Sequence, residues 1–83
     1  MPISVTKEEI INQLFNIFSK ITGEENINAF TEISPQQKEA LIVIDIMVEI
    51  EMQFGVSLQP YDDTKFKTLG EIVDHVLPKI QNG

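Results

Sequence analysis

The stretch from Gln36 to Val56 constrains the fold most strongly, because it has a helical pattern and is apolar on two sides. It reads QQKEALIVIDIMVEIEMQFGV, and between Ala40 and Val48 the only polar residue is Asp45. A helix that is apolar on nearly every side must bury more than one of its faces. In a chain of 83 residues, the second side is therefore either buried in the same domain or shown to a partner.

The apolar residues fall on two separate faces when they are placed on a helical wheel at about 100° per residue. The face expected to join the core consists of Val43, Ile46, Met47, Ile50 and Phe54. The opposite face, called the docking face below, consists of Leu41, Val48 and Met52 with Asp45 beside them, and it is flanked by Ile44, Glu49 and Glu51. Burial under the long loop or under the short helix that follows is one interpretation of this face. The acids favour a contact surface for a partner, because a carboxylate is costly to bury unpaired.

The rest of the chain also has helical rather than strand-like patterns. A first amphipathic helix is predicted from about residue 6 to 21, with Thr6 as its N-cap and Gly23 as its C-cap. A long loop over residues 23–34 follows, and we expect Phe30 and Ile33 to anchor it in the core. The central helix is expected to begin between residues 35 and 40 and to end at Gly55.

The C-terminal part predicts a short helix and then a longer one. Residues 61–66 are expected to form one or two helical turns, and the last helix opens with the capping-box pattern Thr68 to Glu71. It is expected to end near Leu77, because Pro78 cannot continue the hydrogen-bond ladder. The predicted fold is all-α, a small bundle of three main helices plus one short helix, in one domain over residues 1–83.

The charge balance limits the kinds of partner. Thirteen acids and six bases give a net charge of −7, which disfavours nucleic acid and anionic membrane surfaces and favours a basic protein. No residue is cysteine, the start MPISVTKEEI lacks the features of a signal peptide, and no run reaches the ~20 apolar residues of a membrane span. We expect a freestanding cytoplasmic monomer that does not insert into membranes.

Candidate catalytic and metal-binding residues are few. His75 is the only histidine and lies among apolar residues, so we interpret it as a structural or surface residue rather than a catalytic base. The pair Asp62 and Asp63 is more typical of a helix start than of a metal site. We therefore predict neither an enzyme nor a metal site.

The order of these features resembles the acyl carrier protein family over nearly the whole chain. Residues 51–55, Glu-Met-Gln-Phe-Gly, fit the family's Glu-x-x-Phe-Gly, and the apolar residues Val56 and Leu58 follow. The run TKFKTLGEIVDHV is similar to the family's entry into its last helix. This resemblance implies a four-helix carrier of fatty acid or polyketide biosynthesis, which bears acyl groups as thioesters on 4′-phosphopantetheine.

Position 40 departs from the family. Counting back from Phe54 aligns Glu39-Ala40-Leu41 with the family's Asp-Ser-Leu, so alanine stands where the cofactor-bearing serine is expected. Alanine has no oxygen for the phosphodiester, and Ser34 lies six residues too early to replace it. One explanation is a deliberate serine-to-alanine change, which we favour because the surrounding pattern is complete. The other is a natural carrier-like domain that has lost its arm.

The resemblance also implies a set of partners and contact residues. Basic surfaces of a ketosynthase, an acyltransferase or a phosphopantetheinyl transferase would contact the central helix at Glu39, Leu41, Ile44, Asp45, Val48, Glu49, Glu51 and Met52. Two alternatives stay open. One is an aminoacyl or peptidyl carrier of nonribosomal synthesis, and the other is a natural adaptor that only binds a basic enzyme.

Overall fold

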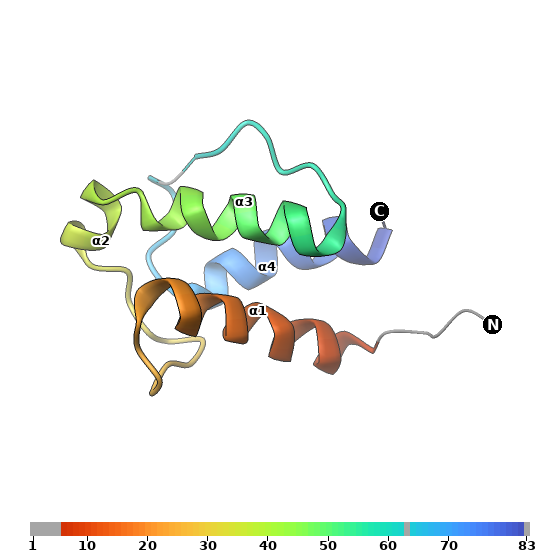
Figure 1. Cartoon of the computed structure of the whole chain (residues 1–83), viewed down its shortest axis with the longest axis horizontal. Coiled ribbons are helices and arrows are strands. Elements are labelled where there is room, and N and C mark those ends of the chain that lie inside the picture. The colour runs from red at the N-terminus through yellow and green to blue at the C-terminus, as the bar shows by residue number, and fades with distance from the viewer. Residues whose placement is uncertain (1–5, 63, 83) are drawn as a thin grey trace.

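The computed structural model describes residues 6–62 and 64–82, so the signal-peptide interpretation of residues 1–5 and the interpretation of Asp63 fall outside it. The described residues form four helices: α1 (Lys7–Thr22), α2 (Pro35–Glu39), α3 (Ile42–Phe54) and α4 (Leu69–Asn82). Helices α1, α3 and α4 form the body of the bundle, and the short α2 lies where α3 begins (Figure 1). The all-α prediction of three main helices and a short one is confirmed.

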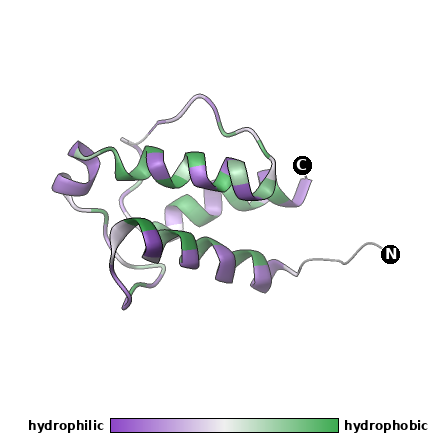
Figure 2. Cartoon of the chain, in the orientation of Figure 1, coloured by the Kyte–Doolittle hydropathy of each residue, from purple (hydrophilic) through white to green (hydrophobic). Residues whose placement is uncertain are grey.

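The core lies between the three long helices. Figure 2 shows the apolar residues of α1 turned towards α3 and α4, while hydrophilic residues line its outer edge. The buried side chains of the helices are Ile10, Leu14, Ile17 and Phe18 from α1, Val43, Ile46, Met47 and Ile50 from α3, and Leu69, Ile72, Val73, Val76 and Leu77 from α4. Burial of such side chains is the main favourable term in folding, at roughly 1.5–3 kcal/mol for each large one.

The predicted ends of α1 are confirmed by its caps. The Thr6 hydroxyl accepts a hydrogen bond from the Glu9 amide at 3.1 Å. Gly23 closes the helix in the left-handed conformation, with φ 75°, and its amide donates to the Ser19 carbonyl. Gly55 ends α3 in the same way, with φ 65°.

The prediction for the loop over residues 23–34 is half right. Ile33 is buried, but Phe30 is 86% exposed, so its predicted role as a core anchor is wrong. The loop is held by its backbone instead, because the amides of Gly70 and Leu69 donate to the carbonyls of Ala29 and Thr31 at 2.9 and 3.0 Å. These bonds direct the backbone on either side of Phe30 towards α4 and leave the ring outside.

Gly70 allows this close approach of the loop to α4. A Cβ atom built at Gly70 would lie 2.7 Å from the Ala29 carbonyl oxygen, and a backbone atom has little freedom to move away. We expect Gly70→Ala to lower the free energy of unfolding by about 1–3 kcal/mol, although alanine is intrinsically the better helix former. Urea unfolding checks this, and a variant at least as stable as the parent would contradict the close contact.

Three predicted helix boundaries are wrong. The short helix lies at residues 35–39, and residues 61–62 and 64–66 are not helical. The stretch 36–55 is not one helix, because Leu41 adopts φ 60° and separates α2 from α3. Helix α4 continues through Pro78 to Asn82 rather than ending near Leu77. The turn after Pro78 is retained because Ile80 packs against the core.

Candidate functional site: the outward face of α3

The two faces predicted for the central helix are found on α3. Val43, Ile46, Met47 and Ile50 are at most 1% exposed. On the opposite side Leu41 is 52%, Val48 38% and Met52 73% exposed, and Asp45 between them is exposed as well. The alternative in which a loop buries this face is therefore wrong. The role of the face in docking is not decided by its exposure and stays a prediction.

Leu41 is held in an unusual backbone conformation at one end of the docking face. Its φ of 60° and ψ of 31° are left-handed, which costs a residue with a side chain roughly 1–2 kcal/mol. The chain reaches this conformation directly after α2, whose Ser34 and Gln37 form a reciprocal capping box with bonds of 3.1 and 2.9 Å. Backbone strain of this kind is often found at functional positions. Here the strained residue has an apolar side chain that is half-exposed.

Ala40 lies in the break between α2 and α3. It is exposed, its amide donates to the Gln36 carbonyl, and α3 begins two residues later. A hydroxyl at this position would be open to solvent and close to the positive end of α3, where a phosphate is favoured. Ser34, by contrast, uses its hydroxyl as the N-cap of α2.

The predicted acidic contacts fall into two groups. Glu39 and Asp45 are exposed, and within the described chain neither forms a salt bridge. Glu49 is half-buried and lies 3.7 Å from Lys20 of α1, a surface pair that contributes little to stability. Ile44, the apolar residue on the flank, is half-buried.

Glu51 is bound to the loop that follows α3. Its carboxylate accepts one hydrogen bond from the Leu58 amide at 2.8 Å and another from the Tyr61 hydroxyl. Tyr61 is half-buried and packs against the core, so this contact joins α3 to the middle of the loop. The sequence alone suggested a docking role for Glu51 and gave no signal for Leu58 as its partner.

Both pKa values at this contact are shifted. The Leu58 amide and then the Tyr61 hydroxyl lower the pKa of Glu51 below 4.5. The Glu51 carboxylate in turn raises the pKa of Tyr61 above 10.0. Because the folded pKa of Glu51 is depressed, the contact stabilises the fold fully above the unfolded value and weakens as pH falls through the folded value.

We expect Glu51→Ala to loosen the loop while leaving α3 intact, because alanine favours a helix but accepts no hydrogen bond. The Leu58 amide should then exchange with solvent about threefold to tenfold faster, as for an ordinary hydrogen bond. Acidification of the parent chain through the lowered pKa of Glu51 should reduce the protection of the Leu58 amide, which is its exchange rate compared with that of an unprotected amide at the same pH. Glu49→Ala is the matched control on α3, and equal acceleration in both variants would contradict the contact.

The other candidate residues, His75 and Asp62, make local contacts. His75 packs edge-on against Phe66 with ring centroids 5.3 Å apart, and burial, followed by Lys65 and Lys79, lowers its pKa. Asp62 accepts hydrogen bonds from the amide and hydroxyl of Thr64 in a tight turn. Across residues 6–62 and 64–82 no three His, Asp or Glu side chains are grouped to hold a metal, and no helix is both long and apolar enough to cross a bilayer.

This small all-α architecture, with an exposed acidic and apolar helix face, is consistent with the acyl carrier fold. The chain is 28% identical over 81 residues to the meromycolate extension acyl carrier protein of Mycobacterium leprae, which covers 89% of this chain and 67% of that protein. The protein of the same name from Mycobacterium tuberculosis is 29% identical over 79 residues, covering 87% and 65%. The acyl carrier protein of Thermotoga maritima is 27% identical over 78 residues, covering 90% and 96%.

The names of these relatives support the resemblance of this chain to the acyl carrier protein family. Acyl carrier proteins are carriers and not catalysts, which agrees with the prediction that the chain is not an enzyme. The chain spans about two thirds of the length of the mycobacterial relatives and nearly all of the Thermotoga protein. No family profile and no solved structure matches the chain.

Proposed function

We propose that this chain is a cytoplasmic, monomeric acyl carrier protein of fatty acid or polyketide biosynthesis. It docks to basic enzymes, and it lacks the serine to which the cofactor would be attached. The observation that carries the proposal is the exposure of Leu41, Val48 and Met52 around Asp45, on a helix whose other side forms the core. The names of the relatives favour an acyl carrier over an aminoacyl or peptidyl carrier.

The chemistry of the docking face suits brief contacts with several enzymes. The three apolar side chains supply affinity when water is removed from them, and methionine adapts to differently shaped partners. Asp45 and Glu39 are exposed and unpaired within the described chain, so they are free to meet Lys or Arg on ketosynthases, acyltransferases or phosphopantetheinyl transferases. Glu51 contributes negative charge, but its oxygens already accept bonds from the loop.

The residues present do not fit 4′-phosphopantetheine as a covalent group, because Ala40 offers no hydroxyl. We infer that the parent protein has serine at this position and that this chain carries the change to alanine. If alanine is the native residue, a natural adaptor that only docks is the better description. The intact docking face beside Ala40 suits both the carrier and this adaptor.

Charge reversal on the docking face tests the proposal. We expect Asp45→Lys to slow association with a phosphopantetheinyl transferase about tenfold or more at low salt, because long-range attraction steers the encounter. Added salt should reduce the difference. Stopped-flow fluorescence measures the rate, and circular dichroism checks that helicity is unchanged.

Glu25→Lys is the matched control, because it changes the net charge equally on the loop before α2, where Glu25 is exposed. Equal slowing by both variants would show that only net charge matters. Loss of helicity in Asp45→Lys would show that the acid is structural and would remove it from the docking face.

A further inference from the structure

The methionine sulfurs are the most readily oxidised groups of this chain. The sequence has three methionines and neither cysteine nor tryptophan. Peroxides oxidise cysteine thiolates and methionine thioethers, so a peroxide that meets this chain reacts with methionine. Met1 lies outside the described residues, and the other two, Met47 and Met52, both belong to α3. The helix that is proposed to meet the partner therefore also carries both of the described oxidisable sulfurs.

Met47 and Met52 lie on different faces of α3. Five positions at about 100° each place them about 140° apart around the helix axis. Met47 is 1% exposed and belongs to the core, whereas Met52 is 73% exposed. A peroxide therefore reaches the Met52 sulfur in the folded chain, but it reaches the Met47 sulfur only when the core opens.

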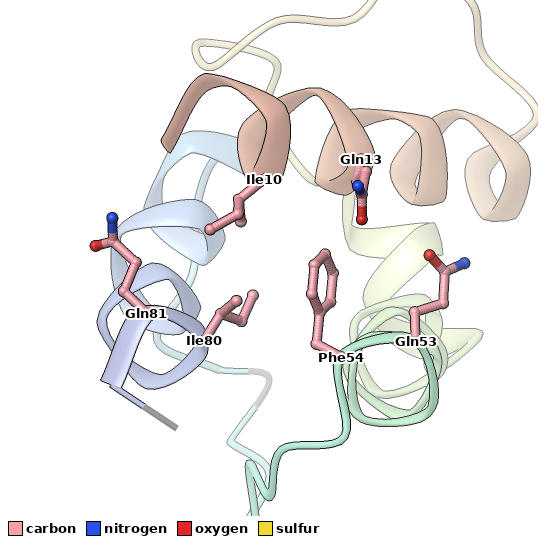
Figure 3. A pocket seen from close by; sticks show the side chains of 6 residues that line it. All are labelled: Ile10, Gln13, Gln53, Phe54, Ile80 and Gln81. Carbon is pink, nitrogen blue, oxygen red and sulfur yellow. The ribbon is translucent and has the colours of Figure 1, made fainter. Parts of the chain in front are cut away.

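The end of α3 shows which way Met52 points. Phe54 points together with Ile10 and Ile80 into a hollow between α1, α3 and α4 (Figure 3). Phe54 follows Met52 by two positions, or about 200° around the helix axis, so Met52 points away from the bundle. Val48, one turn before Met52 on the same side, is exposed as well. The Met52 sulfur therefore belongs to the docking face.

Oxidation of Met52 changes the docking face without disturbing the core. Conversion to the sulfoxide turns a flexible apolar side chain into a polar one. In the free chain the new oxygen is hydrated, because the side chain is exposed. In a complex the same oxygen must lose its water against a surface that suits an apolar thioether, and burial of an unpaired polar group is costly. The modification is therefore tolerated in the free chain and penalised in the complex.

We propose that Met52 is a reversible oxidation site through which peroxides weaken docking to the partner enzymes. The effect on docking rests on the proposed function, whereas the oxidation itself needs no partner. The Met52 sulfur attacks one oxygen of hydrogen peroxide, and a sulfur–oxygen bond forms as the oxygen–oxygen bond breaks. The proton of the transferred oxygen leaves with the other oxygen as water, so methionine loses two electrons and the peroxide gains them. A thiol-dependent methionine sulfoxide reductase restores the thioether, releasing the oxygen as water and oxidising two thiols to a disulfide.

The oxidation rates of the two sulfurs test the site. The full chain is incubated with hydrogen peroxide, and tandem mass spectrometry measures the gain of one oxygen atom at each methionine. We expect Met52 to react about tenfold faster than Met47, or more, in the folded chain, because only its sulfur is accessible. In concentrated urea the two rates should become similar. Equal rates in the folded chain would overturn the site.

Affinity for a phosphopantetheinyl transferase tests the effect on docking. Once the peroxide is removed, the oxidised chain should bind about threefold to tenfold more weakly, because the complex must bury the new oxygen. Treatment with methionine sulfoxide reductase should restore the affinity. Met52→Leu is the matched variant, because it retains Met1 and Met47 but has no sulfur at position 52. Its affinity should not change on the same treatment, and an equal loss in this variant, or no loss in the parent chain, would overturn the effect.

The fold of the oxidised chain separates a changed surface from a damaged core. Circular dichroism and urea unfolding should match those of the reduced chain, because Met52 lies outside the core. Unfolding on oxidation of Met52 would contradict a surface effect. A reduced chain that does not bind the transferase would overturn the proposed function and, with it, the effect on docking. The oxidation rates would then still decide whether Met52 is the oxidation site.

Discussion

Replacing Ala40 with serine is expected to turn the chain into a substrate for a phosphopantetheinyl transferase. The residue is exposed and lies two residues before α3, so a serine hydroxyl would be accessible to the enzyme and close to the helix N-terminus. The neighbouring docking face is already present in the chain with alanine, where Leu41 and Asp45 are exposed. This variant has the largest expected effect, from no modification to complete modification.

Mass spectrometry after incubation with coenzyme A and the transferase measures this change. The serine variant should gain the mass of one phosphopantetheine arm, and the parent chain should gain nothing. The parent also serves as the control for Ser34, whose hydroxyl caps α2. No gain in the variant would favour the adaptor over the carrier, and a gain in the parent would show that the aligned position is wrong.

Replacing Leu41 with glycine is expected to separate stability from binding. Glycine adopts φ 60° without the cost of roughly 1–2 kcal/mol that a side chain incurs, and this gain offsets the lost packing of a half-exposed leucine. The free energy of unfolding should therefore stay within about 1 kcal/mol of the parent. Affinity for a partner enzyme should fall about 10–100-fold, or roughly 1.4–2.8 kcal/mol, because the apolar contact is lost.

Phe30→Ala is the matched control for this prediction, because Phe30 is a large exposed apolar residue in the loop before α2, outside α3. It should change affinity less than twofold. Urea unfolding and isothermal titration with the same enzyme give the two quantities. A large loss of stability with unchanged affinity would show that Leu41 serves the fold rather than the partner.

The sequence predicts well those features that arise from periodic patterns and local caps. The inward and outward faces of α3 follow from the spacing of its apolar residues, and the ends of α1 follow from Thr6 and Gly23. These features depend on residues within one or two turns of each other, which the sequence displays directly.

Other features depend on contacts between distant segments, which no local pattern reveals. The break at Leu41 comes at the end of a run of good helix formers and before the β-branched residues 42–44, with neither glycine nor proline to mark it. The hydrogen bonds that the Glu51 carboxylate accepts from Leu58 and Tyr61 join residues seven and ten positions apart. Phe30 is predicted in the core, but the residues on either side of it are bonded through their backbone to the start of α4, and its ring stays exposed.

The position of the partner enzyme on this chain can be mapped by NMR, with the isotope-labelled chain titrated by an unlabelled phosphopantetheinyl transferase. We expect the largest shifts and line broadening at Leu41, Asp45, Val48 and Met52, and smaller ones at Glu39, with α1 and α4 little changed. Shifts confined to α1 and α4, with the outward face of α3 unaffected, would contradict docking through α3.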